Sequence, residues 1–144
     1  GNFSIALAPC FAQVVATEIS RTSIKSAQYN IALNQVENLQ VLQMSAEDVS
    51  AALAQGNALK QLDLTDMQLN TVLVDPPRAG LDAGTVQLVS RFNDIIYISC
   101  NPQTLADNLQ HLSQTHDIKQ LAVFDQFPYT HHIETGVWLR KRPS

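Results

Sequence analysis

The sequence predicts an α/β fold, with a doubly wound, mostly parallel sheet that closes with an antiparallel hairpin at its C-terminal end. Two observations point to this fold. Short apolar runs alternate with helical stretches over most of the chain, which is typical of a parallel sheet covered by helices. Beyond His116 the pattern changes to strands separated by a proline-containing turn. The chain has 144 residues, the usual length of one domain, so we expect a single domain over residues 1–144.

Four apolar runs are the expected parallel strands. They are Val14–Glu18, Leu39–Met44 (the weakest of the four), Thr71–Val74 and Ile95–Ser99. The runs are largely continuous rather than alternating, which is typical of parallel strands that helices cover on both faces. We therefore expect these strands to be buried.

Helical patterns lie between these runs. They cover Ser20–Asn34, Ser45–Ala54, Gly84–Phe92 and Pro102–Gln114. Ser45 followed by Asp48 indicates a helix start, because a serine oxygen accepts from free N–H groups and an acid suits the positive helix end. Residues 1–4 lead directly into a further helix, whereas a domain of this kind begins with a strand. We therefore expect the first strand of the sheet to be missing from this chain.

The C-terminal part is predicted to be a β-hairpin. Its strands are Ile118–Phe124 and Thr135–Arg140, with a turn at Phe127–Pro128. The polar segment Gly56–Asn70 is expected to be an excursion before the third strand.

Charge and cysteine content exclude several classes of protein. Nine Lys and Arg against thirteen Asp and Glu give a net charge of −4, which argues against binding nucleic acid by bulk electrostatics. Cys10 and Cys100 do not make a disulfide framework, so a reducing cytoplasm is predicted. The N-terminus lacks the positive region of a signal peptide, and no apolar run is long enough to span a bilayer. We therefore expect no membrane association.

Two candidate ligand-binding residues lie near the N-terminus. Glu18 ends a predicted strand, where an acid can accept hydrogen bonds from both hydroxyls of a ribose, although an ordinary solvated acid also fits this position. Asn2, beside Gly1 at the mouth of a helix, could place its amide near a carboxylate or phosphate.

The sequence Asp75-Pro76-Pro77-Arg78 follows the third strand. The prolines stiffen the backbone and remove N–H donors, so this corner can hold a carboxylate in place beside a planar base. An exposed tight turn is the alternative interpretation.

The sequence Ser99-Cys100-Asn101-Pro102 gives the sharpest signal. Cys100 ends a buried strand just before a helix, whose N-terminus favours the thiolate form, and Pro102 suits an early helical position. This placement favours a nucleophile over a buried structural cysteine. Cys10, in an apolar stretch, is expected to be a small buried hydrophobic residue.

The last motif lies between the hairpin strands. Phe127 and Tyr129 could flank a flat base, or could simply pack in a corner. His131 and His132 suggest zinc, but neighbouring side chains on an extended chain point to opposite sides, so no metal is predicted. Glu134 heads the closing strand, where it could accept a proton across the crevice from Cys100.

Together, in this order, these motifs resemble the S-adenosylmethionine-dependent RNA uridine C5-methyltransferases. GNFSIALA resembles the second half of the family's cofactor loop, and VVATEI its ribose-binding strand. DPPRAGLD, YISCNPQTL and FDQFPYTHHIETGVWL resemble its catalytic-domain signatures. The FPYTHH form is more similar to the members that methylate the tRNA T loop, giving ribothymidine, than to those that act on ribosomal RNA.

The resemblance implies the Rossmann-like class I methyltransferase fold, in the C-terminal catalytic domain of a longer enzyme whose N-terminal RNA-binding region is absent. It implies that Asn2, Glu18 and Asp75 bind S-adenosylmethionine and that Asp75 also borders the uracil. Cys100 would be the nucleophile and Glu134 the base, and Arg78 is our choice as donor to the uracil oxygen. The implied partner is the tRNA T arm, with no obligate protein partner.

Three other interpretations stay open at this point. A ribosomal RNA uridine methyltransferase would use the same chemistry on another RNA. A non-catalytic nucleotide-binding module would have a buried, inert Cys100. An NAD-type oxidoreductase would need a G-x-G-x-x-G turn, and the chain begins too late to show one, while Asp75–Arg78 and the strand-end cysteine favour methyl transfer.

Overall fold

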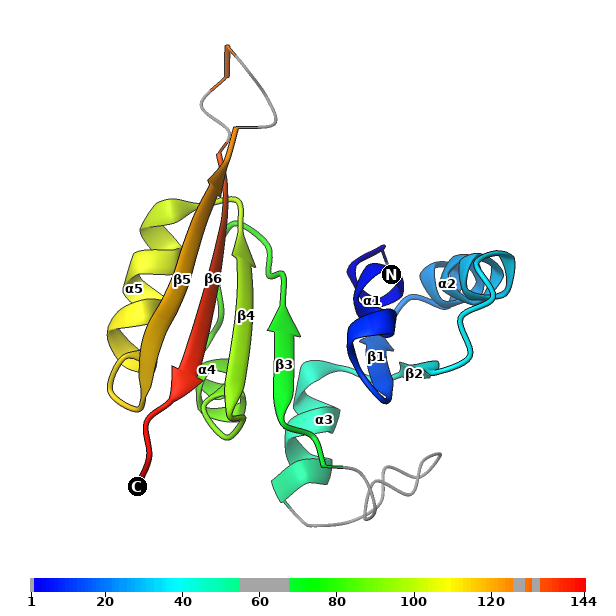
Figure 1. Ribbon diagram of the computed structural model, residues 1–144, viewed down its shortest axis with the longest axis horizontal. Coiled ribbons are helices and arrows are strands. Elements are labelled where there is room, and N and C mark those ends of the chain that lie inside the picture. Colours follow the sequence, from blue (N-terminus) through cyan, green and yellow to red (C-terminus); the bar gives the residue numbers. More distant parts are fainter. Residues whose placement is uncertain (1, 55–67, 126–128, 131–132) are drawn as a thin grey trace. The chain divides into compact units, whose positions relative to one another are not determined.

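The structure, a computed structural model, describes residues 2–54, 68–125, 129–130 and 133–144, apart from the side chain of Asn2. The chain forms two compact units, Gly1–Asp66 and Met67–Ser144, and each is described here by itself (Figure 1). The prediction of a single domain over residues 1–144 stays a prediction.

The first unit contains two parallel strands and the helices that flank them. Its elements, in order, are α1 (Asn2–Leu7), the 3₁₀ helix η1 (Ala8–Cys10), β1 (Val14–Glu18), α2 (Arg21–Leu33), β2 (Leu39–Gln43) and α3 (Ala46–Ala54). Strands β1 and β2 pair in register from Val14 beside Leu39 to Glu18 beside Gln43. The Nδ2 of Asn38 donates to the carbonyls of Ala8 and Phe11, both at 2.8 Å, and so ties η1 to the start of β2.

Side-chain caps fix where the helices of the first unit begin. The Ser20 hydroxyl accepts from the Ser23 N–H and starts α2. Ser45 and Asp48 bond reciprocally, backbone N–H to side chain in both directions, which confirms the predicted helix start. The Asp48 carboxylate accepts from the Ser45 N–H and also from the Ser45 hydroxyl, and these two bonds hold the pKa of Asp48 below its ordinary value.

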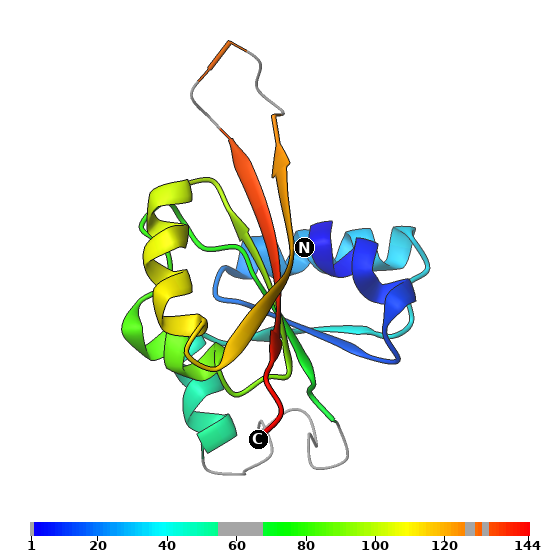
Figure 2. The same cartoon turned by 60° about the vertical axis from the view of Figure 1, so that its left-hand side comes forward.

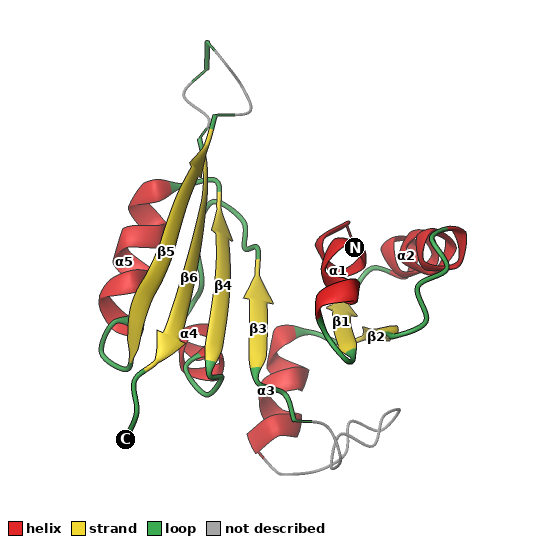
Figure 3. Cartoon of the chain, in the orientation of Figure 1, coloured by secondary structure: helices red, strands yellow, loops and turns green. Residues whose placement is uncertain are grey.

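The second unit is a mixed four-stranded sheet with two helices. Its elements are β3 (Thr71–Val74), α4 (Ala83–Val89), β4 (Asp94–Ser99), α5 (Pro102–Leu112), β5 (His116–Phe124) and β6 (Glu134–Lys141). The strand order is β3-β4-β6-β5. Strand β3 runs parallel to β4, and β6 runs antiparallel to both β4 and β5 (Figure 3).

Helices α4 and α5 lie on one face of this sheet (Figure 2), and the core lies between the helices and the sheet. The core side chains are Val89, Ile95, Tyr97, Leu105, Leu112, Val137 and Leu139. Burial alternates along β4, with Ile95, Tyr97 and Ser99 buried and the residues between them partly exposed. The second face of the sheet is therefore accessible within this unit.

Most predicted elements are confirmed, since the chain has a helix or strand at each expected position among the described residues. Helix α4 ends at Val89 rather than Phe92, because the N–H groups of Arg91 and Phe92 close tighter turns on Leu88 and Val89. The turn at Phe127–Pro128 and most of the segment Gly56–Asn70 lie outside the described residues.

Two predictions were wrong. Cys10 is exposed rather than buried, because η1 ends there and the chain then turns toward β1. The parallel strands are not buried on both faces: β1 and β3 contain no fully buried residue, and each pairs with one strand among those described. Within the described ranges, no helix is long and apolar enough to cross a membrane.

The core of the second unit provides a stability test. Leu139 in β6 is fully buried, so Leu139→Ala should lower the free energy of unfolding by about 2–5 kcal/mol through lost burial and a cavity. Leu121 in the neighbouring strand is 54% exposed, so Leu121→Ala should cost far less. Denaturant unfolding measures both variants. Equal losses would contradict the assignment of the core.

Candidate active site

Three chemically active side chains belong to one edge of the four-stranded sheet. Asp75 follows the last residue of β3, Cys100 follows the last residue of β4, and Glu134 is the first residue of β6. Because β6 is antiparallel to β4, its first residue lies at the same edge as the carboxyl ends of β3 and β4 (Figure 3). The topology thus collects a thiol and two carboxylates from three separate parts of the chain.

The register of β4 and β6 sets Cys100 against Glu134. Ser99 pairs with Thr135, so one further step along both strands brings Cys100 opposite Glu134. Residues opposite each other in an antiparallel pair have Cα atoms about 4.5–5.5 Å apart. Thr135 and Ser99 are buried against the helices, and alternation directs the neighbouring positions to the other face. Cys100 and Glu134 therefore share the accessible face of the sheet.

Asp75 belongs to the same face. Val72 and Val74 pack against the helix-covered core, so alternation along β3 directs Asp75 to the opposite side.

Gly136 in β6 lies two residues after Glu134, in close contact with apolar side chains. Ile98 and the ring of Phe124 lie 3.4–3.5 Å from where a Cβ on Gly136 would be. A side chain at position 136 would press on this apolar surface beside Glu134.

Cys100 sits in a bend organised by a buried hydroxyl. Ser99, only 3% exposed, donates from Oγ to the Asn101 carbonyl at 3.0 Å and accepts from the Asn101 N–H at 3.1 Å. The Asn101 side chain accepts from the Gln103 N–H and caps α5, which begins at Pro102. The half-buried thiol of Cys100 therefore lies at a capped helix N-terminus, as the sequence predicted.

The segment after Asp75 is tied to the same helix. The Arg78 carbonyl accepts from Asn101 Nδ2 at 3.0 Å and from Thr104 Oγ1 at 3.1 Å. The Gly80 N–H donates to the Pro77 carbonyl at 2.9 Å, which closes a tight turn. Asp75 and Arg78 are both exposed. The loop that carries them is thus fastened to the helix that carries the cysteine bend.

Glu18 ends β1 in the first unit. Its Oε1 accepts from the N–H groups of Ile19 and Ser20, at 2.8 and 2.9 Å. The bond from Ser20, and then that from Ile19, hold the pKa of Glu18 below its ordinary value, so the group is a carboxylate at neutral pH. The remaining acceptor capacity of the carboxylate suits the hydroxyl groups of a ribose.

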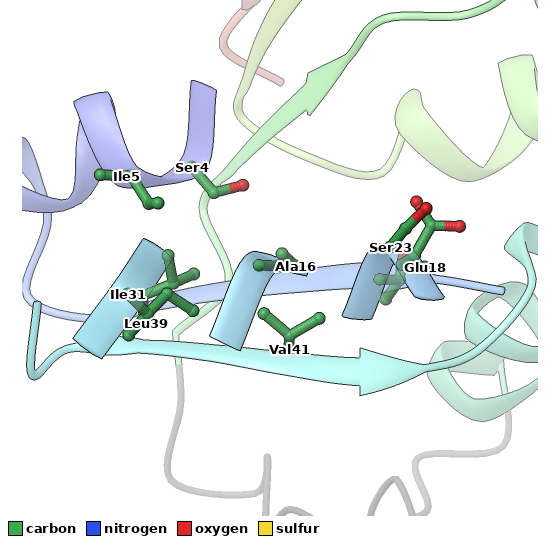
Figure 4. Close-up of a pocket in the computed structure, with 10 residues that line it drawn as sticks. Ser4, Ile5, Ala16, Glu18, Ser23, Ile31, Leu39 and Val41 are labelled. Atoms are coloured by element: carbon green, nitrogen blue, oxygen red, sulfur yellow. The ribbon is translucent and has the colours of Figure 1, made fainter. Parts of the chain in front are cut away.

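Glu18 also lines a pocket of about 100 Å³ between α1, α2 and the two strands (Figure 4). Ser23 lies beside Glu18 at one end, and the apolar Ile31 and Leu39 lie at the other. The pocket thus places an anionic hydrogen-bond acceptor beside apolar side chains.

The chain is similar in sequence to proteins of known activity. The family model for tRNA (Uracil-5-)-methyltransferase matches residues 1–142. The chain belongs to this family. Among curated tRNA/tmRNA (uracil-C(5))-methyltransferases, that of Shewanella halifaxensis is 59% identical over 145 residues, and that of Actinobacillus pleuropneumoniae is 57% identical. The alignments cover 99% of this chain but only 40% and 39% of those relatives, so the chain spans about two fifths of their length.

Solved structures confirm the class I methyltransferase fold that the sequence predicted. Pyrococcus abyssi tRNA (uracil-54, C5)-methyltransferase, in complex with S-adenosyl-L-homocysteine, matches with a TM-score of 0.72 at 32% identity, over 96% of this chain and 31% of that one. A ribosomal RNA methylase from Streptococcus thermophilus matches with a TM-score of 0.68 at 9% identity, over 99% of this chain and 81% of its own, and shows the fold alone.

The structure brings some predicted site residues of this family member together and leaves others undescribed. Asp75, Cys100 and Glu134 share one edge and one face of the second unit. Tyr129 is fully exposed, with a φ of 70°, while Phe127, like the histidines at 131–132, lies outside the described residues. Asn2 is the first residue of α1. In the described part of the chain, no cluster of three or more His, Cys, Asp and Glu could hold a metal ion.

Sequence reasoning missed the residues that hold the site in shape. They are Ser99, Thr104 and Asn108, together with Asn101, whose Nδ2 donates to the Arg78 carbonyl. Asn101 carried a readable signal as a cap residue before proline. The others are ordinary polar residues in a strand or helix, and only the tertiary contacts reveal them.

Gly80 provides a test of loop rigidity. Its φ is +77°, and a Cβ there would lie 2.8 Å from Asn108 Oδ1 and 3.1 Å from Thr104 Cβ. Gly80→Ala should therefore lower the free energy of unfolding by about 1–3 kcal/mol, because the backbone conformation and the contact both disfavour a side chain.

The matched control is Gly84→Ala in the first turn of α4, where φ is ordinary and the one neighbouring atom is Asp82 Oδ1 at 3.2 Å. Thermal unfolding of both variants measures the difference. A Gly80→Ala protein as stable as Gly84→Ala would contradict the packing of this loop on α5.

Proposed function

We propose that this chain is the catalytic domain of an enzyme that methylates C5 of uridine in tRNA, with S-adenosylmethionine as methyl donor. The observation that carries the proposal is the strand register that sets Cys100 opposite Glu134, with Asp75 on the same sheet face. Further support comes from the relatives named tRNA/tmRNA (uracil-C(5))-methyltransferases.

We further propose that the target is uridine 54 in the T loop, which becomes ribothymidine. The support is the sequence FPYTHH between β5 and β6 and the 32% identity to the enzyme from Pyrococcus abyssi that is named for uracil 54. The uridine must leave its stack to reach a thiol at the sheet edge, which costs a few kcal/mol. The stiff Asp75–Arg78 corner, together with Phe127 and Tyr129, is proposed to hold the extruded base.

Methylation requires a nucleophile from the protein, because C5 of uracil by itself is too weak a nucleophile to take the methyl group. The thiolate of Cys100 adds to C6, which forms a carbon–sulfur bond and turns the ring into an enolate with an electron-rich C5. Negative charge develops on the uracil oxygen, and the Arg78 guanidinium is the proposed donor to it. Cys100 lies directly before the N-terminus of α5, where the helix dipole attracts negative charge.

S-adenosylmethionine, when bound, supplies a methyl group activated by its sulfonium. After C5 has gained that methyl group, Glu134 removes the C5 proton. The electron pair of the C5–H bond forms the C5–C6 double bond, and the carbon–sulfur bond breaks to return the thiolate of Cys100. Both groups must reach the same ring, and neighbouring positions on two adjacent strands bring them close together.

We assign the binding of the cofactor's ribose to Glu18, with Asn2 and Asp75 as further contacts. The acidic balance of the chain gives little general attraction for phosphates. We therefore expect that much of the grip on RNA comes from other parts of the full-length protein.

The first test replaces the nucleophile. In the full-length protein that carries this chain, Cys100→Ala should abolish methyl transfer to a T-arm RNA, because it removes the thiol that is proposed to add to C6. Cys10→Ala, which removes the exposed cysteine, should retain activity. Transfer of radiolabelled methyl groups measures both. Full activity of Cys100→Ala would refute the proposed mechanism.

Glu134→Gln tests the base. The amide has nearly the shape of the carboxylate but cannot accept the C5 proton, so the variant should add to C6, gain the methyl group at C5 and stall as a protein–RNA adduct. A denaturing gel detects that adduct on unmodified RNA, with wild type as the control that releases its product. Rapid product release by the variant would remove Glu134 from this role.

Glu18→Ala should weaken S-adenosylmethionine binding in calorimetry and leave the thermal midpoint nearly unchanged, because Glu18 contributes hydrogen bonds only to adjacent N–H groups. Its lowered pKa means that the acceptor stays ionised further into the acidic range than an ordinary glutamate. Protonation of Glu18 should therefore weaken wild-type affinity only below the pH range in which an ordinary glutamate takes up its proton. Unchanged affinity in Glu18→Ala would contradict the assignment.

A further inference from the structure

We propose that Asn108 is a positioning residue, which holds the segment from Arg78 to Leu81 on α5 and so sets the Arg78 side chain relative to Cys100. This inference rests on the proposed function, in which both residues act on one uracil. Asn108 lies two turns into α5 and belongs to none of the motifs that the sequence singled out.

The contact between Asn108 and Leu81 is a two-point clamp. Asn108 Oδ1 accepts from the Leu81 N–H at 2.9 Å, and its Nδ2 donates to the Leu81 carbonyl at 3.0 Å. One planar amide thus satisfies both backbone groups of one loop residue. Such a pair fixes both the position and the orientation of the backbone, which a single hydrogen bond would leave free to rotate.

A buried tyrosine fixes the orientation of that amide. The hydroxyl of Tyr97, a fully buried residue of β4, donates to Asn108 Oδ1 at 2.7 Å. Burial raises the pKa of Tyr97, so the hydroxyl keeps its proton at neutral pH and remains a donor. With two donors directed at Oδ1, the amide cannot flip without losing both bonds.

The clamp and the cysteine bend are parts of one connected set of bonds. Arg78 accepts through its carbonyl from Asn101 and Thr104 in the first turn of α5, while Leu81 is held by Asn108 in a later turn. Between them, Gly80 lies against Asn108 and Thr104 so closely that no side chain fits. The loop is therefore fixed at both ends to the helix that begins at the Cys100 bend, and Arg78 lies within the fixed part.

Positioning and mere stabilisation predict different kinetics. If Asn108 acts by setting Arg78, its loss should lower kcat with little change in KM for RNA, and should have no further effect once the Arg78 side chain is gone. If Asn108 only stabilises the fold, its effect should be independent of Arg78 and multiply with it.

The test is a double-mutant cycle in the full-length protein, with methyl transfer to a T-arm RNA as the readout. Asn108→Ala should lower kcat by about tenfold or more, since displacement of a catalytic group by about 1 Å has costs of this size. Arg78→Ala should lower kcat at least as much, and the double variant should match Arg78→Ala alone. Gln110→Ala, an exposed position on the same helix, should match wild type.

Asn108→Asp enters the same cycle as a second variant with almost the same shape. Its carboxylate still accepts from Leu81 and Tyr97 but turns an oxygen toward the Leu81 carbonyl, so it too should lower kcat only while Arg78 is present. Thermal unfolding checks that each variant is folded.

The outcomes separate this inference from the proposed function. Losses of kcat that multiply in the double variant, or an Arg78→Ala protein with normal kcat, would overturn the positioning role alone. A wild-type protein that methylates no tRNA would overturn the proposed function, and this inference with it.

Discussion

The antiparallel pairing of β4 with β6 is the constraint on which the rest of the site depends. It joins residues some forty positions apart in the sequence and runs from Asp94 beside Arg140 to Ser99 beside Thr135. The core enforces this register, because Ile95 and Tyr97 alternate with partly exposed positions and pair with Leu139 and Val137 on the helix-covered face. A slip by one residue would turn the core positions of β6 to solvent and direct Glu134 toward the helices. The packing that stabilises the unit thus also holds Glu134 on the same face as Cys100.

Helix α5 is the second organising element. Its cap residue Asn101 is part of the cysteine bend. The side chains of Asn101, Thr104 and Asn108 hold the Asp75–Leu81 loop through hydrogen bonds to its backbone. A helix packed on the core by Leu105 and Leu112 is a rigid base for both loops. Functional side chains on irregular backbone are therefore held by a regular element, which is how exposed loops can keep a defined geometry.

Much of this arrangement could be predicted from the sequence because its signals are local. Apolar runs bounded by polar residues predicted the strands. Ser45 with Asp48, and Pro102 at an early helical position, predicted helix starts that depend only on nearby residues. Motif order then gave the family. The depth of burial could not be predicted in this way, because it depends on which elements cover a strand. Cys10 has apolar neighbours in sequence but is exposed at the end of η1, and Ile96 has an apolar side chain on the accessible face.

The bonds that hold the site could not be predicted for a related reason. Asn108 and Leu81 are 27 positions apart, and Tyr97 is 11 positions before Asn108, so no local pattern connects them. These residues meet only in the folded unit, where Asn108 of α5 bonds both to Tyr97 of β4 and to the backbone of Leu81.

The measurement that tests the central claim most directly is a trapping experiment with a T-arm RNA that carries 5-fluorouridine at the target position. Fluorine at C5 cannot leave as a proton does, so attack by Cys100 followed by methyl transfer should stop at a covalent complex. The full-length protein, S-adenosylmethionine and this RNA should give a band that survives a denaturing gel, and peptide mapping should place the attached nucleotide on Cys100. A stable complex attached at any other residue, or no complex under conditions in which natural tRNA is methylated, would contradict the account.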